Sequence, residues 1–169
     1  MKKLNICVTI LLFMLFQSCT ESSNPQALKP DEQTVKIDFH CSFKEHLNTF
    51  THKLTKDLVI DGTITIDFWL TKAEQRMILA KADTIDFFNL PDSLNWADDD
   101  SIHLAISPDP GIQYLRIQAG ESDKTVYWNI VNSYAEEFGR LQELTSFIIS
   151  IIMAKPEYKS LPEANGGYD

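Results

Sequence analysis

Three histidines of this 169-residue chain, His40, His46 and His52, are spaced six residues apart. Strands or loops could bring two of them together, and imidazole is a common metal ligand. A metal site usually has a second recognisable pair of ligands, but the chain contains no HExxH and no CxxC motif. We therefore expect no metal and no cofactor, and we interpret the three histidines as exposed residues on polar faces.

The acidic run Asp98-Asp99-Asp100 is a second candidate for chemistry. Carboxylate oxygens in a flexible loop can hold calcium. This run lacks the alternating ligands and the glycine of an EF-hand loop, and consecutive side chains point apart. We interpret it as a solvated acidic loop, in which Asp98 and Asp100 are candidates for binding a polar ligand.

The polar cluster Thr55-Lys56-Asp57 directly precedes an apolar segment. Lys56 and Asp57 could face a small cleft and bind a polar ligand. Alternatively, they could form an ion pair that fixes the entry of a strand, which is the interpretation we favour. Both residues join Asp98 and Asp100 as candidate ligand-binding residues.

The common motifs of nucleophilic catalysis are missing, because the chain contains neither GxSxG nor SxxK. Its six glycines form no phosphate-binding loop. Cys41 is a thiol on the apolar side of an alternating segment, and its neighbour His40 points to the opposite side. We therefore expect Cys41 to be buried and inert, and we predict no catalytic residue.

The tryptophans offer one further kind of contact. Trp69 and Trp128 lie in alternating segments, where each could be part of the core or a stacking platform for a sugar. Trp96 lies in the acidic loop. Their spacing does not decide between these roles.

The first nineteen residues have the pattern of a targeting signal. Lys2 and Lys3 precede an apolar run, Ile6–Phe16, which is too short to span a bilayer. The Cys19 that follows resembles the lipobox cysteine of bacterial lipoproteins, which is acylated after the signal is removed. We expect residues 1–18 to be a lipoprotein signal peptide. An ordinary cleaved signal or an uncleaved anchor is the alternative.

Residues 19–33 are polar and contain Pro25 and Pro30, which is typical of a flexible tether. In Gram-negative lipoproteins a residue other than Asp after the cysteine directs the protein to the outer membrane, and Thr20 stands there. We therefore expect a lipid-anchored envelope protein, on the outer membrane, with one globular domain over 34–169.

Charge restricts the partners of this protein. The chain has 15 basic and 24 acidic residues, net −9, and loss of Lys2 and Lys3 with the signal would make it −11. Nucleic acids are therefore excluded as partners, and anionic headgroups should repel the domain. The expected membrane contact is made through the lipid anchor alone.

Alternation of polar and apolar residues predicts a strand over Val35–Phe43. Residues 45–56 are polar with scattered aromatics and show no clear pattern. Asp61-Gly62 predicts a hairpin between strands at 53–60 and 63–70, with one long bulged strand as the alternative. Alternating segments predict further strands at 102–106, 112–118 and 125–130, the last two joined by residues 119–124.

Two capping-box patterns predict helices. T-x-x-E at 71–74 begins a helix over 72–83, and S-x-x-E at 133–136 begins a longer one that ends near Ala154. The order of elements predicts an α+β fold, in which a mainly antiparallel sheet packs against two helices.

The last two turns of the longer helix are apolar nearly all round, FIISIIM. We expect them to be buried in the core. The alternative is a partner surface, which would require Phe147, Ile149 and Ile152 to be exposed together.

Several pieces of the chain resemble a group of small lipoproteins of unknown function, similar to those of Bacteroidota. These pieces are Thr55-Lys56-Asp57, the helix start after Leu70-Thr71, DFFNLPD at 86–92 and KPEYKSLP at 155–162. The resemblance covers roughly Phe50 to Tyr168. It implies one domain and an envelope location, and it assigns no catalytic residue.

We therefore expect a non-enzymatic module that binds an envelope protein or a small polar ligand. A hydrolase acting on envelope material and an accessory subunit of an envelope complex are the alternatives.

Overall fold

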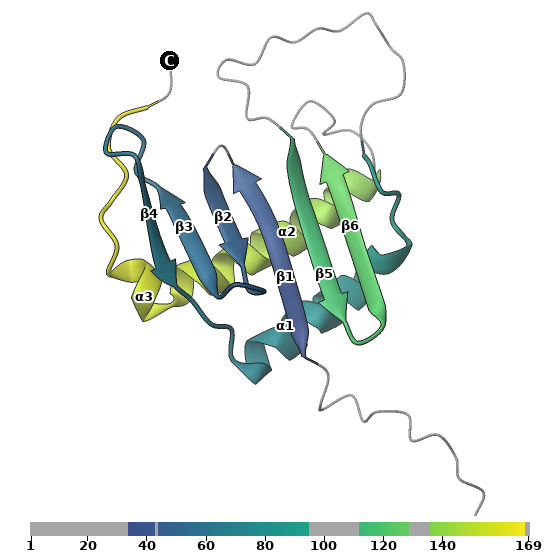
Figure 1. Ribbon diagram of the computed structural model, residues 1–169. Coiled ribbons are helices and arrows are strands. Elements are labelled where there is room, and N and C mark those ends of the chain that lie inside the picture. The colour runs from purple at the N-terminus through teal and green to yellow at the C-terminus, as the bar shows by residue number, and fades with distance from the viewer. Residues whose placement is uncertain (1–33, 43, 95–111, 129–135, 168–169) are drawn as a thin grey trace, which may run out of the picture. The chain divides into compact units, whose positions relative to one another are not determined.

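Six antiparallel strands form one sheet in the order β4-β3-β2-β1-β5-β6 (Figure 1). The computed structural model describes residues 34–42, 44–94, 112–128 and 136–167 of the chain. The strands are β1 (Val35–Ser42), β2 (Glu45–Asn48), β3 (Lys53–Asp57), β4 (Thr63–Asp67), β5 (Gln113–Ala119) and β6 (Ser122–Trp128).

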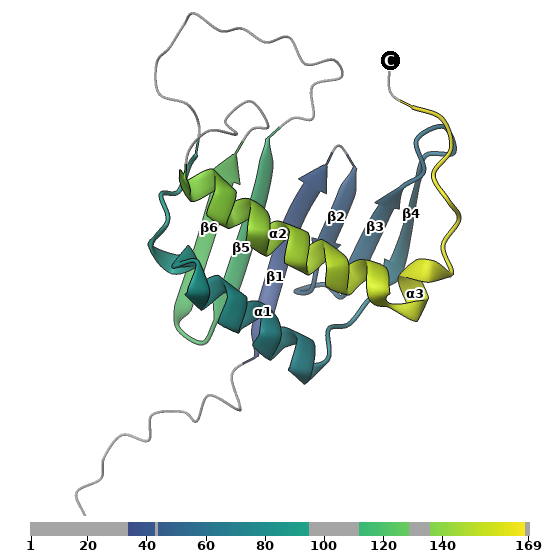
Figure 2. The same ribbon diagram turned by 180° about the vertical axis from the view of Figure 1, so that it is seen from behind.

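Helices α1 (Lys72–Thr84) and α2 (Glu136–Ala154) cover one face of this sheet (Figure 2). The predicted α+β fold, an antiparallel sheet packed against two helices, is confirmed. Apolar side chains from both layers fill the space between them, because each layer must bury its apolar side. The most deeply buried include Ile37, Phe39, Leu115 and Ile117 of the sheet and Ile78, Leu144 and Ile148 of the helices. None of the described helices lies on the other face, which we call the open face.

Helix α1 begins with the predicted capping box. The Glu74 amide donates to the Thr71 hydroxyl at 3.2 Å, and the Thr71 amide donates to the Glu74 carboxylate at 2.7 Å. A short 3-10 helix, η2 (Phe87–Asn89), then returns the chain to the core and buries Phe87 completely. These local contacts explain why the helix could be located from the sequence.

Helix α2 ends at Ala154 as predicted, and its apolar last turns are largely part of the core. Ile148, Ile151 and Ile152 are buried, Phe147 is partly buried, and Ile149 is 36% exposed. The capping box predicted at 133–136 begins outside the described residues. No described helix is both long and apolar enough to span a bilayer.

The C-terminal segment folds back on the domain. Helix α3 (Pro156–Lys159) begins with a proline at its first turn, directly after α2. Leu161 is buried and Tyr158 is partly buried against the core. Further along, the Asn165 amide donates to the Leu58 carbonyl at 3.3 Å.

The hairpin predicted at Asp61-Gly62 is confirmed. Its strands, β3 and β4, are shorter than the predicted ranges 53–60 and 63–70. The Leu58 amide donates to the Gly62 carbonyl at 2.7 Å, which closes a turn longer than Asp61-Gly62 alone. Gly62 has φ +80°, a conformation that favours glycine. A single bulged strand, the alternative, is therefore wrong.

Two other boundaries differ from the prediction. Strands β5 and β6 are joined only by Gly120 and Glu121 instead of by 119–124, because the polar residues after Glu121 pair with β5. Strand β2 lies in the segment without a clear pattern. It forms because β1 and β3 pair with it on both sides, which a local pattern does not reveal. The predicted strand at 102–106 lies outside the described residues.

Candidate functional site

One row of side chains crosses the open face at right angles to the strands. Residues directly opposite one another in paired strands project from the same face of a sheet. The register places one residue of each strand in line, and we call this set the transverse row. In sheet order it consists of Thr65, Thr55, His46, His40, Tyr114 and Tyr127.

Four rings of the transverse row form a continuous series. The ring centroids of His46 and His40 are 5.9 Å apart, and those of His40 and Tyr114 are 5.8 Å apart. Tyr127 follows at 5.8 Å from Tyr114. The planes of His40 and Tyr114 differ by only 8°, so these two rings present nearly parallel faces.

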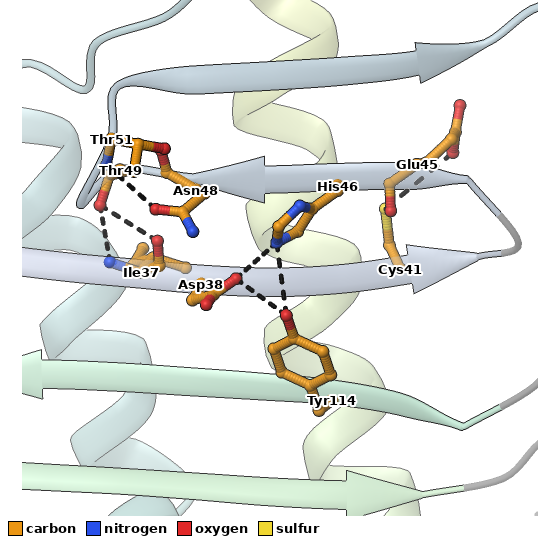
Figure 3. Close-up of polar contacts among 9 residues, drawn as sticks. All are labelled: Ile37, Asp38, Cys41, Glu45, His46, Asn48, Thr49, Thr51 and Tyr114. Atoms are coloured by element: carbon orange, nitrogen blue, oxygen red, sulfur yellow. Dashed lines mark hydrogen bonds and ion pairs between the residues drawn. The ribbon is translucent and has the colours of Figure 1, made fainter. Parts of the chain in front are cut away.

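Asp38 connects two of these rings through its carboxylate (Figure 3). Its Oδ1 lies 2.5 Å from His46 Nε2 and accepts a hydrogen bond from the Tyr114 hydroxyl at 3.1 Å. Because a carboxylate can only accept, Nε2 of His46 carries a proton. The side chains of Asp38 and His46 are 20% and 33% exposed, so solvent reaches this cluster only in part.

The environment of Tyr114 keeps its phenol protonated. Burial raises its pKa to about 12, and the negative charge and hydrogen bond of Asp38 act in the same direction. Tyr114 therefore donates a hydrogen bond at every physiological pH. His40 is held differently, since its buried Nδ1 has no hydrogen-bond partner among the described residues. Its ring is positioned by the neighbouring rings.

This arrangement suits binding better than nucleophilic catalysis. Asp38 and the Tyr114 hydroxyl both lie next to the same nitrogen of His46, so the imidazole does not relay a proton between them. Cys41 is packed on the helix-covered side of the sheet. Across the described part of the chain, no three His, Cys, Asp or Glu side chains are arranged to hold a metal ion.

A second row of polar residues lies beside the transverse row, and we call it the charged row. In sheet order it consists of Asp67, Lys53, Asn48, Asp38, Arg116 and Thr125. Lys53 and Asp67 form an ion pair at 2.5 Å, and Arg116 binds both carboxylate oxygens of Asp123. The open face thus places hydrogen-bonding groups along one side of the rings.

The sequence-predicted candidates Lys56 and Asp57 lie away from this site. Lys56 is buried, donates to the Pro162 carbonyl at 2.8 Å and has its ammonium 4.9 Å from the Tyr158 ring centroid. The Asp57 carboxylate accepts from the Val59 amide at 2.9 Å within the turn. These contacts hold Lys56 against the tail and Asp57 within the turn. The ion pair between the two residues at the entry of a strand stays a prediction.

The other predicted site residues are Cys19, Asp98 and Asp100, and all three lie outside the described residues. The predictions for them, lipidation at Cys19 and ligand binding at the two aspartates, therefore stay predictions.

Cys41 is only partly buried, so the expectation of a fully buried thiol is wrong. A break in the β1–β2 register beside Cys41 lies at the end of the sheet, where packing is less complete. Its Sγ donates to the Glu45 carbonyl at 3.4 Å. With Tyr158 and Met153 it lines a hollow of about 30 Å³, which is large enough for water but too small for an organic ligand.

The tryptophans and histidines lie in different environments. Trp128 is buried and its Nε1 donates to Gln113 at 2.6 Å, so it belongs to the core. Trp69 is 56% exposed and stacks on His52 at 5.8 Å. Trp96 lies outside the described residues. His40 and His46 do come together, as their spacing allowed, whereas His52 lies apart from the transverse row.

Asp38, Tyr114 and Tyr127 were not among the predicted site residues. Each lies on the polar side of an alternating strand, which is the only signal that the sequence contains for them. The missing information was the pairing of β1 with β5, which brings distant segments together.

Comparison of the chain with protein-family models, with curated proteins and with solved structures gives no match in any of the three.

Proposed function

We propose that this protein is a lipid-anchored protein of the bacterial envelope whose domain binds a ligand on the open face of its sheet. The observation that carries the binding role is the transverse row, in which four rings lie side by side on the face that none of the described helices covers. The signal-like start, Cys19 and the polar segment 19–33 support the lipid anchor and the outer-membrane location.

The rings of the transverse row are accessible to different degrees: those of His40, His46 and Tyr114 are half-buried, and that of Tyr127 on the edge strand β6 is exposed. Tyr127 is 44% exposed. A ligand that covered its ring would partly shield the ring from water. Binding sites commonly combine aromatic side chains with a few polar groups that fix the orientation of the ligand. The transverse row and the charged row supply these two components next to each other.

The two alternative functions have less support. A hydrolase requires a concave site with convergent titratable groups, and the hollow beside Cys41, at about 30 Å³, is too small to be that site. An accessory subunit would require Phe147, Ile149 and Ile152 to be exposed together. Ile152 is buried and Phe147 is partly buried, so these residues form no common patch.

The anchor is tested by fractionation of cells that produce either the natural chain or the Cys19→Ala variant. We expect the natural chain in the outer-membrane fraction, with a mature N-terminus at an acylated Cys19 by mass spectrometry. The variant should leave the membrane fraction. A variant that remains there would contradict the lipid anchor.

The binding role is tested by capture of the Cys19→Ala chain on its own envelope fraction, so that acylation does not contribute. Tyr127→Ala should reduce capture because it removes an exposed ring of the transverse row. Met77→Ala is the matched control, since Met77 is 49% exposed on α1, on the covered side. Equal capture of all three chains would contradict a role for the open face.

A further inference from the structure

We infer that the ligand of the open face is a neutral glycan chain that lies along the transverse row, across the strands. This inference rests on the proposed binding role of the same face. Four features carry it: the length of the row, the orientation of its rings, the polar groups beside them and the charge of the protein.

The length of the transverse row fits an extended ligand. The row has one residue on each of six strands, so it includes five spacings of about 4.8 Å and is about 24 Å long. A single sugar would cover only a fraction of this length. Several linked sugars would cover it, with the chain direction perpendicular to the strands.

The two central rings of the row, those of His40 and Tyr114, are nearly parallel to each other. Figure 3 shows the Tyr114 ring extending from β5 toward β1 on the open face, with its hydroxyl toward Asp38 and His46. The ring of His40 is nearly parallel to it, at 8°. One side of a sugar ring carries mainly C–H groups, which pack on the electron-rich face of an aromatic ring. The parallel pair at the centre of the row therefore matches a sugar ring that lies on it. The neighbouring rings are inclined, His46 by 63° to His40 and Tyr127 by 47° to Tyr114.

The charged row supplies partners for sugar hydroxyls. Hydroxyl groups both donate and accept, and Asp38, Asn48 and Arg116 offer carboxylate, amide and guanidinium groups along one side of the rings. Thr55 and Thr65 extend the row beyond the rings and share a hydrogen bond of 2.8 Å. A hydroxyl-rich chain would thus meet polar groups along its length.

The charge of the protein favours a neutral glycan over anionic ligands. The chain has a net charge of −9, and the basic residues Lys53 and Arg116 of the charged row are each paired with an aspartate. A polyanion would be repelled by the whole domain and would have to compete with these two aspartates for the cations.

Affinity electrophoresis of the full chain, in a polyoxyethylene detergent that contains no sugar, tests this inference. The gels contain dextran, mannan, laminarin or hydroxyethylcellulose, and one gel contains the acidic polymer alginate. We expect at least one neutral polymer to retard the chain and alginate to leave it unretarded. Absence of retardation by every neutral polymer, or retardation by alginate alone, would overturn the inference.

Variants locate the binding face. Tyr127→Ala should weaken retardation about tenfold, the equivalent of about 1.4 kcal/mol, whereas Tyr127→Phe should preserve it because the ring remains. Trp69→Ala is the matched control, because Trp69 is an exposed aromatic outside the transverse row. Loss of binding in Trp69→Ala with full binding in Tyr127→Ala would overturn the assignment to the transverse row.

Periodate oxidation of the envelope fraction distinguishes this inference from the proposed function. If capture depends on Tyr127 and disappears after oxidation of sugar diols, both are supported. Capture that depends on Tyr127 and survives oxidation leaves the binding role intact and overturns the glycan. Capture that does not depend on Tyr127 overturns both.

Discussion

His40 on β1 and Tyr114 on β5 lie directly opposite each other, with their rings 5.8 Å apart and nearly parallel. The contact joins two segments that are far apart in the sequence. Tyr114 also donates its hydroxyl hydrogen to Asp38, the residue two positions before His40. The centre of the open face is therefore built by one strand pairing, and its contacts can be removed individually.

Removal of the Tyr114 hydroxyl should destabilise the domain modestly. Tyr114→Phe deletes the hydrogen bond to Asp38 and keeps the ring, so we expect a loss of about 1–2 kcal/mol in the free energy of unfolding. Urea denaturation measures this quantity. Tyr127→Phe is the matched control, because Tyr127 is an exposed tyrosine of the same row, and it should change stability less. Equal effects would contradict a specific role for the Tyr114–Asp38 contact.

Alkaline pH should weaken the domain through Tyr114. Burial raises its pKa from 10.0 to about 12 in the folded protein, so the folded state binds its proton more tightly than the unfolded state. This contribution to stability is fully present below pH 10 and is lost as the pH rises toward 12. The free energy of unfolding should therefore fall less steeply between pH 10 and 12 in Tyr114→Phe. Parallel curves for the two proteins would contradict the raised pKa.

The start of α1 should lose stability in acid. Burial raises the pKa of Glu74, but hydrogen bonds from Lys155 and from Thr71 lower it more, so the net shift is downward. A lowered pKa in the folded state stabilises the protein above the ordinary value of 4.5, and this contribution is lost as the pH falls through the folded value.

The variant Glu74→Gln tests this pair, because glutamine preserves the capping box but removes the charge. We expect a loss of about 0.5–1 kcal/mol at pH 7, which becomes smaller as the pH falls below 4.5. The Lys155–Glu74 pair, at 2.8 Å, is only 12% and 19% exposed. Glu143→Gln, whose partner is Lys81, is a more exposed control and should have a smaller effect. A loss that is independent of pH would contradict an electrostatic origin.

The capping box itself can be tested at Thr71. Thr71→Ala removes the hydroxyl that accepts from the Glu74 amide and should cost about 1 kcal/mol in thermal or urea denaturation. Thr71→Ser retains the hydroxyl and should restore most of this loss. Failure of serine to do so would indicate that the methyl group of Thr71, and not its hydroxyl, stabilises the helix start.

Lys56 should hold the C-terminal tail in place. Lys56→Met keeps much of the side-chain volume but removes the hydrogen bond to the Pro162 carbonyl. We expect faster hydrogen exchange at the Asn165 amide, which donates to Leu58, and unchanged exchange in the central strand β1. Lys53→Met is the control, because Lys53 lies on the same strand and projects from the open face. Unchanged exchange at Asn165 would reopen the interpretation of Lys56 as a ligand-binding residue.

The parts of the fold that were predicted correctly depend on neighbours in the sequence. The capping box at Thr71 and Glu74 involves residues three positions apart, and the alternation in β1 is a property of consecutive residues. The parts that were missed depend on distant partners. Strand β2 contains few apolar residues, and it is a strand because β1 and β3 bind both of its edges.

The candidate site follows the same division. The sequence by itself determined that His40 and Tyr114 each lie on the polar side of a strand, because side chains alternate with a period of two. Only the tertiary structure decided that these strands are neighbours and that their register aligns one ring beside another. It also moved Lys56 into a buried contact with the tail. Strand order and register depend on packing between distant segments, and a local pattern does not specify which segments will pair.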